Sequence, residues 1–177
     1  MLRLPRASYA PLLVVALAMA PVACREITVP FEDPTATTFA PSLNINLGAA
    51  GWTRTSTGLY YRDISTGSGE TADSGDTIRA YYKGWLTDGR SFESNRDTGQ
   101  PYSFILGTGG VIKGWDEGIR GMRVNGRRQL VIPPALAYGA SSQGNIPAGS
   151  VLIFEIDLVS ATAPAATPAT TSVADGR

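Results

Sequence analysis

The sequence predicts an α+β domain dominated by antiparallel strands, because its apolar residues mostly recur with a period of two and only one segment shows a helical period. The 177 residues are 43% hydrophobic and 17% charged, an ordinary balance for a chain that buries a core. Dipeptides favoured by tight turns, at 88–89 and 125–126, separate the alternating segments. We therefore expect one folded unit over residues 57–160.

Four segments of this unit have the residue types and alternation of β-strands. The clearest begins at residue 77, where Ile78, Ala80 and Tyr82 alternate with other residues and predict one buried face. The last segment alternates in the same way and places Glu155 opposite a row of large apolar side chains. The four expected strands are residues 59–64, 77–82, 127–132 and 152–159.

A single segment shows the spacing of a helix. Ile112, Trp115, Ile119 and Met122 fall on a common face at helical intervals. Three glycines within this segment each weaken a helix by about 1 kcal/mol. We therefore expect a short helix that is held in place by packing against the sheet.

Residues 1–24 have the organisation of a secretory signal peptide. A basic start with Arg3 and Arg6 precedes an apolar stretch, residues 10–23. As a helix this stretch would rise about 21 Å, which is shorter than a hydrocarbon core of about 30 Å. The alternative, a buried N-terminal helix, is weaker because two prolines interrupt the stretch.

Cys24, the single cysteine of the chain, stands where the apolar stretch ends. Together with the preceding Pro21-Val22-Ala23 it resembles the cleavage box of bacterial lipoproteins, in which the cysteine is lipidated and becomes the new N-terminus. The alternative is an ordinary signal peptide whose removal leaves a free thiol, a liability in an exported chain. We therefore predict a lipid anchor on Cys24 and a location in the periplasm or cell envelope.

The segments that flank the folded unit lack the patterns of packed structure. Residues 25–56 are rich in Thr, Pro, Ala and Asn without sustained periodicity, which predicts a flexible linker. Residues 161–177 are rich in Ala, Thr and Pro and contain one large hydrophobic residue, Val173. Because such a segment buries too little apolar surface to offset its ordering entropy, we expect a disordered tail.

The composition excludes several classes of function. The chain has no histidine, which excludes a Ser-His-Asp triad, a Cys-His protease and a His-ligated zinc site. One cysteine cannot form an intrachain disulfide or a thiolate metal cluster. Lys and Arg total 15, as do Asp and Glu, so no overall field favours nucleic acid. We expect no metal, no cofactor and no nucleic-acid partner.

Short motifs in a fixed order carry a more specific signal. In order and spacing they resemble the FKBP-type peptidyl-prolyl cis-trans isomerases over essentially the whole folded unit. The motifs are Tyr82-Lys83-Gly84-Trp85, Ser91-Phe92-Glu93-Ser94, Val111-Ile112-Lys113-Gly114-Trp115-Asp116, Ile132-Pro133-Pro134, Leu136-Ala137-Tyr138-Gly139, Ile146-Pro147 and Leu152-Ile153-Phe154-Glu155.

The resemblance implies a curved antiparallel sheet of five or six strands wrapped around one short helix, with an apolar aromatic pocket between them. It implies proline-containing polypeptide substrates, a non-covalent mechanism and affinity for the family's macrolide inhibitors. Trp115 would form the pocket floor, while the Ile112 backbone N–H and the Tyr138 hydroxyl would bind carbonyls beside the proline. The matching catalytic positions are Tyr82, Phe92, Glu93, Ile112, Trp115, Tyr138 and Phe154, and the matching substrate-binding positions are Tyr102, Phe104, Val111 and Ile146.

Two positions depart from the family's pattern. Glu93 stands where the family usually has Asp, and Thr98 stands where it often has an Arg that pairs with that Asp. Arg96 is close enough in sequence to be an alternative partner of Glu93. The complete aromatic set favours an isomerase that acts on exported proteins. The altered polar network is the basis for the alternative, a non-catalytic proline-binding module or chaperone.

Overall fold

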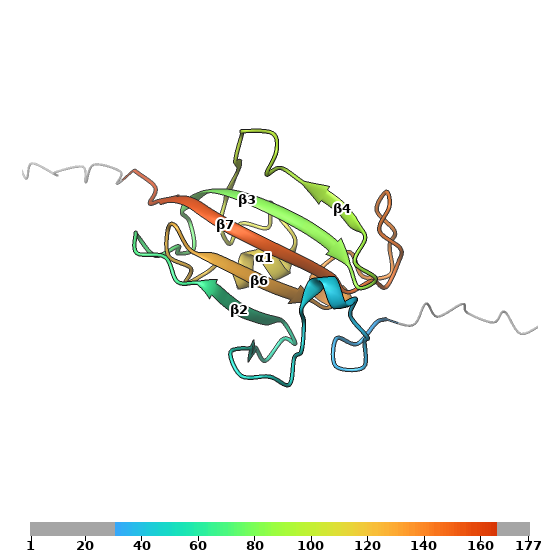
Figure 1. Cartoon of the computed structure of the whole chain (residues 1–177). Helices are drawn as coiled ribbons and strands as arrows, with labels where there is room; N and C mark the ends of the chain where they lie inside the picture. The colour runs from blue at the N-terminus through green and yellow to red at the C-terminus, as the bar shows by residue number, and fades with distance from the viewer. Residues whose placement is uncertain (1–30, 166–177) are drawn as a thin grey trace, which may run out of the picture.

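The computed structural model describes residues 31–165, in which one antiparallel sheet packs its inner face against a short helix (Figure 1). This arrangement confirms the α+β class. The predicted signal peptide, Cys24 and residues 166–177 lie outside the described residues. The elements are β1 (Thr53–Arg54), β2 (Tyr60–Ser65), β3 (Thr77–Leu86), β4 (Ser91–Ser94), β5 (Tyr102–Ile105), α1 (Lys113–Gly118), β6 (Arg127–Ile132), β7 (Leu152–Thr162) and two 3-10 turns, η1 (Pro41–Leu43) and η2 (Pro134–Leu136).

The four strands predicted from alternation are present as β2, β3, β6 and β7. The sheet has seven strands instead of the five or six expected, because the two-residue β1 adds an edge beside β2. The strands that alternation did not indicate are β1, β4 and β5, and none is longer than four residues. Four residues are the shortest segment in which a period of two can indicate a strand, so alternation gives little signal here.

Strand β3 organises the sheet. One of its edges pairs with β7 from Thr77 to Leu86, and its other edge pairs with β5 and then with β4. Between these two short strands, Asn95 fills the gap: the Tyr82 N–H donates to Asn95 Oδ1 at 2.7 Å, and Asn95 Nδ2 donates to the Ala80 carbonyl at 3.1 Å. The Asn95 side chain thus satisfies backbone groups that no strand covers.

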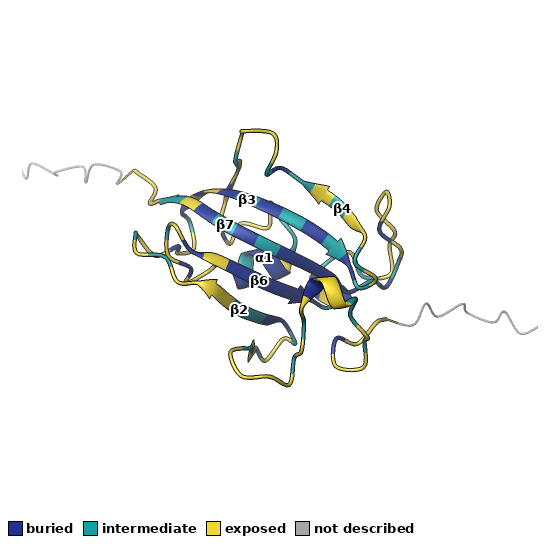
Figure 2. Ribbon diagram, viewed as in Figure 1, coloured by how far each residue is buried: buried dark blue, intermediate teal, exposed yellow. Residues whose placement is uncertain are grey.

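The main core lies between the inner face of the sheet and α1. Figure 2 shows β6 and β7 buried along most of their length, as expected for strands at the centre of a sheet. On β7, the alternate residues Leu152, Phe154, Ile156 and Leu158 belong to this core. The outer face of the sheet carries a second, smaller apolar cluster.

Two glycines explain how α1 approaches the sheet so closely. A Cβ atom on Gly114 would lie 2.4 Å from Ile132 Cγ2, and one on Gly118 would lie 2.7 Å from Leu130 Cδ2. Any larger residue would push the helix away from β6. The glycines that weaken the isolated helix are therefore the residues that let it pack.

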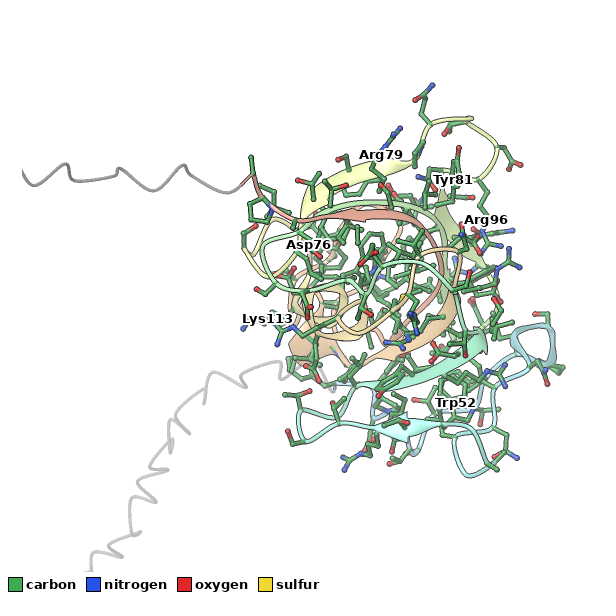
Figure 3. All side chains as sticks on the ribbon, turned by 90° about the vertical axis from the view of Figure 1, so that its left-hand side faces the viewer. Trp52, Asp76, Arg79, Tyr81, Arg96 and Lys113 are labelled. Atoms are coloured by element: carbon green, nitrogen blue, oxygen red, sulfur yellow. The ribbon has the colours of Figure 1, made fainter. Side chains whose placement is uncertain are left out.

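The segment ahead of β2 covers the outer face of the sheet, on the side opposite α1. Figure 3 shows Trp52, from this segment, and Lys113 of α1 on opposite sides of the sheet. Leu43 is 7% exposed and packs with Val131 and Ile153, while its backbone carbonyl accepts a hydrogen bond from Gln129 Nε2. Further members of this outer-face cluster are Phe39, Ala40, Ile45, Leu47, Trp52, Tyr60, Trp85 and Val151.

The prediction of a flexible linker over 25–56 is therefore wrong for residues 39–52, and also for residues 53–54, which form β1. The apolar side chains of residues 39–52 lack a regular spacing because, apart from η1, these residues pack as an irregular segment and not as a strand or α-helix. The predicted disordered tail also begins too early, since β7 continues to Thr162. Between residues 31 and 165, no helix combines the length and apolarity needed to cross a membrane.

Candidate functional site

A cavity of about 450 Å³ opens between the inner face of the sheet and the N-terminal end of α1. Its lining comes from strands β3, β4, β5 and β7, from α1 and the loop before it, and from the loop after η2. The lining residues are Tyr82, Glu93, Tyr102, Gly110, Val111, Ile112, Trp115, Tyr138 and Phe154.

Trp115 lies at the centre of an aromatic cluster. Its ring is 4.9 Å from Tyr82 and 5.3 Å from Phe154 between centroids, in edge-to-face arrangements at 79° and 85°. Tyr102 and Phe104 approach the same indole at 6.4 and 5.7 Å. Edge-to-face contacts hold each ring in one orientation. The cluster therefore forms a fixed apolar floor for a flat, apolar ligand group.

Gly84 on β3 makes room for this cluster. A Cβ atom there would lie 2.6 Å from Phe92 Cζ and 2.9 Å from Phe154 Cε1. The two rings therefore pack directly over the β3 backbone, 5.5 Å apart between centroids. Gly84 belongs to a sequence motif, but the motif alone did not indicate this contact.

Two tyrosine hydroxyls and one carboxylate make the cavity polar on one side. Burial is the largest cause that raises the pKa of Tyr82 above its usual value, and the neighbouring Glu93 carboxylate raises it further. Burial and the charge of Glu93 also raise the pKa of Tyr138. Both hydroxyls are therefore protonated at neutral pH and can donate hydrogen bonds.

The loop before α1 contributes Gly110, Val111 and Ile112 to the cavity wall. Ile112 caps the helix with extended geometry, and its carbonyl accepts the Trp115 N–H at 2.9 Å. Within residues 31–165, the Ile112 N–H itself has no hydrogen-bond partner. Asp116 fixes this loop, because its carboxylate accepts the N–H groups of Gly107 at 2.8 Å and Gly109 at 3.0 Å.

The structure brings eight of the eleven expected site residues to the cavity wall. The other three are not among the lining residues. Phe92 packs on Phe154, Phe104 is 8% exposed and stacks on Tyr102, and Ile146 is 7% exposed within the main core. Gly110 lines the cavity but was not predicted, since a glycine in a loop carries no side-chain signal.

Arg96 does not compensate the charge of Glu93. Its Nη2 lies 3.0 Å from Asp157 Oδ2 and 3.3 Å from Glu155 Oε2. Figure 3 shows Arg96 on the side of the sheet away from Lys113 of α1. No ion pair to Glu93 is present in the described part of the chain. The carboxylate therefore keeps the two tyrosine hydroxyls as its neighbours.

The described residues contain no group of three His, Cys, Asp or Glu side chains that could hold a metal ion. The cavity offers an aromatic wall, two hydroxyls, a carboxylate and the backbone of the loop before α1. These groups can contact a ligand through apolar surface and hydrogen bonds, and they include no strong nucleophile.

Sequence comparison relates this chain to known proteins. Residues 68–159 match the family model described as FKBP-type peptidyl-prolyl cis-trans isomerase. The chain is 46% identical over 103 residues to an FK506-binding protein of Neisseria meningitidis serogroup B, which covers 58% of this chain and 94% of that protein. It is 43% identical over 104 residues to the FKBP-type peptidyl-prolyl cis-trans isomerase FkpA of Escherichia coli K12, covering 59% of this chain and 38% of FkpA.

Solved structures have the same fold. The crystal structure of FkpA from Escherichia coli superposes with a TM-score of 0.63 at 37% identity, over 70% of this chain and 57% of that chain. The crystal structure of AtFKBP13 superposes with a TM-score of 0.59 at 38% identity, over 63% of this chain and 98% of that chain. The similarity therefore covers most of the described sheet and its helix.

Proposed function

This chain belongs to the family of FKBP-type peptidyl-prolyl cis-trans isomerases, and we propose that the aromatic cavity around Trp115 is its active site. The enzyme accelerates rotation about peptide bonds that precede proline. The observation that carries the assignment is the combination of a fixed aromatic floor with an unpaired backbone N–H, that of Ile112, at the same cavity.

The cavity suits this reaction because the reaction needs no covalent chemistry. Rotation about the peptide bond has a barrier of about 18–20 kcal/mol, which arises from amide resonance. At the twisted transition state the amide has lost this resonance and its carbonyl is less polar. An apolar wall that excludes water therefore favours the twisted state over the planar, hydrated ground state.

Each part of the site has a role in this scheme. The Trp115 indole supports the proline ring from below. The Ile112 N–H and the Tyr138 hydroxyl donate hydrogen bonds to the carbonyls beside the proline and hold the substrate in a turn. The protonated Tyr82 hydroxyl, with Glu93 beside it, forms the polar side of the cavity. Each gain of about 1.4 kcal/mol in transition-state binding increases the rate about tenfold.

The test is a cis/trans isomerisation assay with a proline-containing peptide on the chain from residue 25 onward. We expect Trp115→Ala and Phe154→Ala to lower kcat/KM by at least about tenfold, because each removes part of the cavity wall. Trp85→Ala is the matched control, since Trp85 lies on the same strand as Tyr82 but packs on the outer face. Circular dichroism must show that each variant is folded, because truncation of a buried aromatic costs about 3–5 kcal/mol of stability. Folded variants with full activity would remove the cavity from this role.

The second candidate is a binding module that holds proline-containing segments without isomerising them. It is favoured by the absence of a cation beside Glu93 in the described residues. The same assay separates the two functions. A protein that binds the peptide, seen as a change in tryptophan fluorescence, but does not accelerate its isomerisation would be a binding module. The Neisseria relative is named an FK506-binding protein, and we expect the same cavity to bind that macrolide.

We infer that the protein is exported and attached to a membrane by a lipid on Cys24. The support is the signal-like pattern of residues 1–24, in which Cys24 follows the apolar stretch. Expression of the whole chain in a bacterium should give an acyl-labelled product in the membrane fraction, and Cys24→Ser should abolish the labelling. Stable attachment needs more than one acyl chain. Wild-type protein recovered in the soluble fraction with a free thiol would contradict the anchor.

A further inference from the structure

The segment ahead of the family domain is hydrogen-bonded to a loop of the cavity. The Glu32 backbone N–H donates to the Gly149 carbonyl at 2.9 Å, and the Glu32 carboxylate accepts the Val151 N–H at 2.8 Å. Val151 is fully buried, at 0% exposure. Glu32 therefore holds the end of the loop between η2 and β7 at two points, two residues apart.

This loop carries residues of the proposed active site. The Gly149 N–H donates to the Gly139 carbonyl at 2.8 Å and closes the loop at its base. Gly139 directly follows Tyr138, which lines the cavity, and its own N–H donates to the Pro134 carbonyl at 2.9 Å. Two consecutive backbone hydrogen bonds thus connect Glu32 to the residue next to Tyr138.

The segment that carries Glu32 is itself fixed to the sheet. The Ala40 N–H donates to the Thr87 carbonyl at 2.8 Å in the turn between β3 and β4. Leu43, at the end of η1, is buried in the outer-face cluster. Residues 32–43 therefore span from the loop after η2 to the β3–β4 turn, and all of them precede the residues 68–159 that the family model matches.

We propose that Glu32 is a positioning residue for the isomerase reaction: its carboxylate, bound to the Val151 N–H, seats its own backbone N–H on the Gly149 carbonyl, and through Gly149 and Gly139 this contact sets the position of the Tyr138 hydroxyl in the cavity. The inference deepens the proposed function and depends on it. The Trp115 floor belongs to other elements, so loss of Glu32 leaves it intact. The effect should therefore appear in substrate binding and not in the chemical step.

The test compares four proteins that all contain residues 25–177: wild type, Glu32→Ala, Glu32→Gln and Asp33→Ala. Asp33→Ala is the matched control, because it removes a carboxylate one residue away whose hydrogen bonds are to Thr35. We expect Glu32→Ala to raise KM roughly three- to tenfold with little change in kcat. This is the pattern expected when an interaction stabilises the bound substrate and the transition state equally and is then lost. Glu32→Gln keeps an acceptor for the Val151 N–H and should restore most of the loss, and Asp33→Ala should behave as wild type.

Amide hydrogen exchange at Val151 gives the structural measurement on the same proteins. In Glu32→Ala, the amide hydrogen of Val151 should exchange faster than it does in wild type. An unchanged exchange rate would show that the hydrogen bond between Glu32 and the Val151 N–H does not form in solution. Faster exchange with an unchanged KM would show that this hydrogen bond does not position Tyr138. Either result overturns the proposal. If wild type is inactive, the proposed function fails by itself. In that case the dissociation constant of a proline-containing peptide, measured by tryptophan fluorescence, must be roughly three- to tenfold higher for Glu32→Ala than for wild type. An equal dissociation constant would overturn the proposal as well.

Discussion

The tyrosine hydroxyls of the cavity lie beside a carboxylate that no described cation neutralises. Burial and Glu93 both favour the protonated form of Tyr82, so the native protein holds this proton more tightly than the unfolded chain does. The unfolded chain loses it near pH 10, the ordinary value for tyrosine. The stabilisation is therefore complete below about pH 10 and is lost as the pH rises above it.

The raised pKa of Tyr82 predicts that the stability of the protein falls at high pH. We expect the free energy of unfolding of wild type to fall more steeply between about pH 9.5 and 11 than that of Tyr82→Phe, because the variant has no proton to lose at this position. Urea denaturation across this pH range, followed by circular dichroism, measures both slopes. Tyr81→Phe, on the same strand, controls for the loss of a hydroxyl. Parallel curves for wild type and Tyr82→Phe would show that the environment of Tyr82 does not favour its protonated form.

At the scale of elements, one buried arginine joins α1 to the sheet. Arg128 on β6 has a side chain that is 8% exposed, and its Nε lies 2.7 Å from Asp63 Oδ1 on β2. Its Nη1 donates to the Gly118 carbonyl at the end of α1 at 2.9 Å, and its guanidinium stacks 4.5 Å from the centroid of the Tyr61 ring. The last turn of a six-residue helix is thus held by a side chain from the sheet.

We predict that Arg128→Met destabilises the protein by about 2 kcal/mol, because it leaves the Gly118 carbonyl and the Asp63 carboxylate without their donor. The value lies below the usual range for a buried pair, since the Asp63 side chain is 36% exposed and can be hydrated. Thermal unfolding measures the loss. A double-mutant cycle with Asp63→Ala should give a coupling of about 1 kcal/mol. A coupling near zero would mean that Arg128 acts through the helix carbonyl and Tyr61 alone.

At the scale of the whole molecule, the sheet is packed on both faces. The inner face packs on α1 and forms the cavity, while the outer face is covered by the segment that contains η1 (Figure 1). The outer cluster contains residues far apart in the chain, such as Leu43 and Val151. A fragment that begins at residue 57 would expose this cluster and lose the Glu32 contacts.

We therefore predict that Leu43→Ala lowers the free energy of unfolding by about 2–3 kcal/mol, the usual cost of a buried leucine that leaves a partly collapsed cavity. The matched control is Ile64→Ala on β2, since Ile64 is 47% exposed and its truncation should cost much less. Chemical denaturation of both variants provides the comparison. Equal losses in the two variants would show that residues 39–52 do not stabilise the sheet.

Local periodicity was enough to predict the longest elements of this fold. Burial on one face of a strand repeats every second residue, so residues 77–82 and 152–159 identified β3 and β7 without knowledge of their partners. The family motifs then indicated the cavity, because Tyr82, Trp115 and Phe154 occur in a fixed order along the chain. Both kinds of feature could be predicted because their signals lie in neighbouring residues or in a complete motif.

Other features were decided only by tertiary contacts. Leu43 and its neighbours, predicted to be a linker, become core because the outer face of the sheet offers them an apolar surface. Ile146 and Phe104 match pocket positions and are buried in the main core, because the exposure of each side chain depends on the strands and the helix that pack around it. Glu32 acquires its partners through a loop more than one hundred residues further along the chain. Contacts between such distant residues leave no periodic trace in the sequence, because each depends on where the folded sheet places the partner.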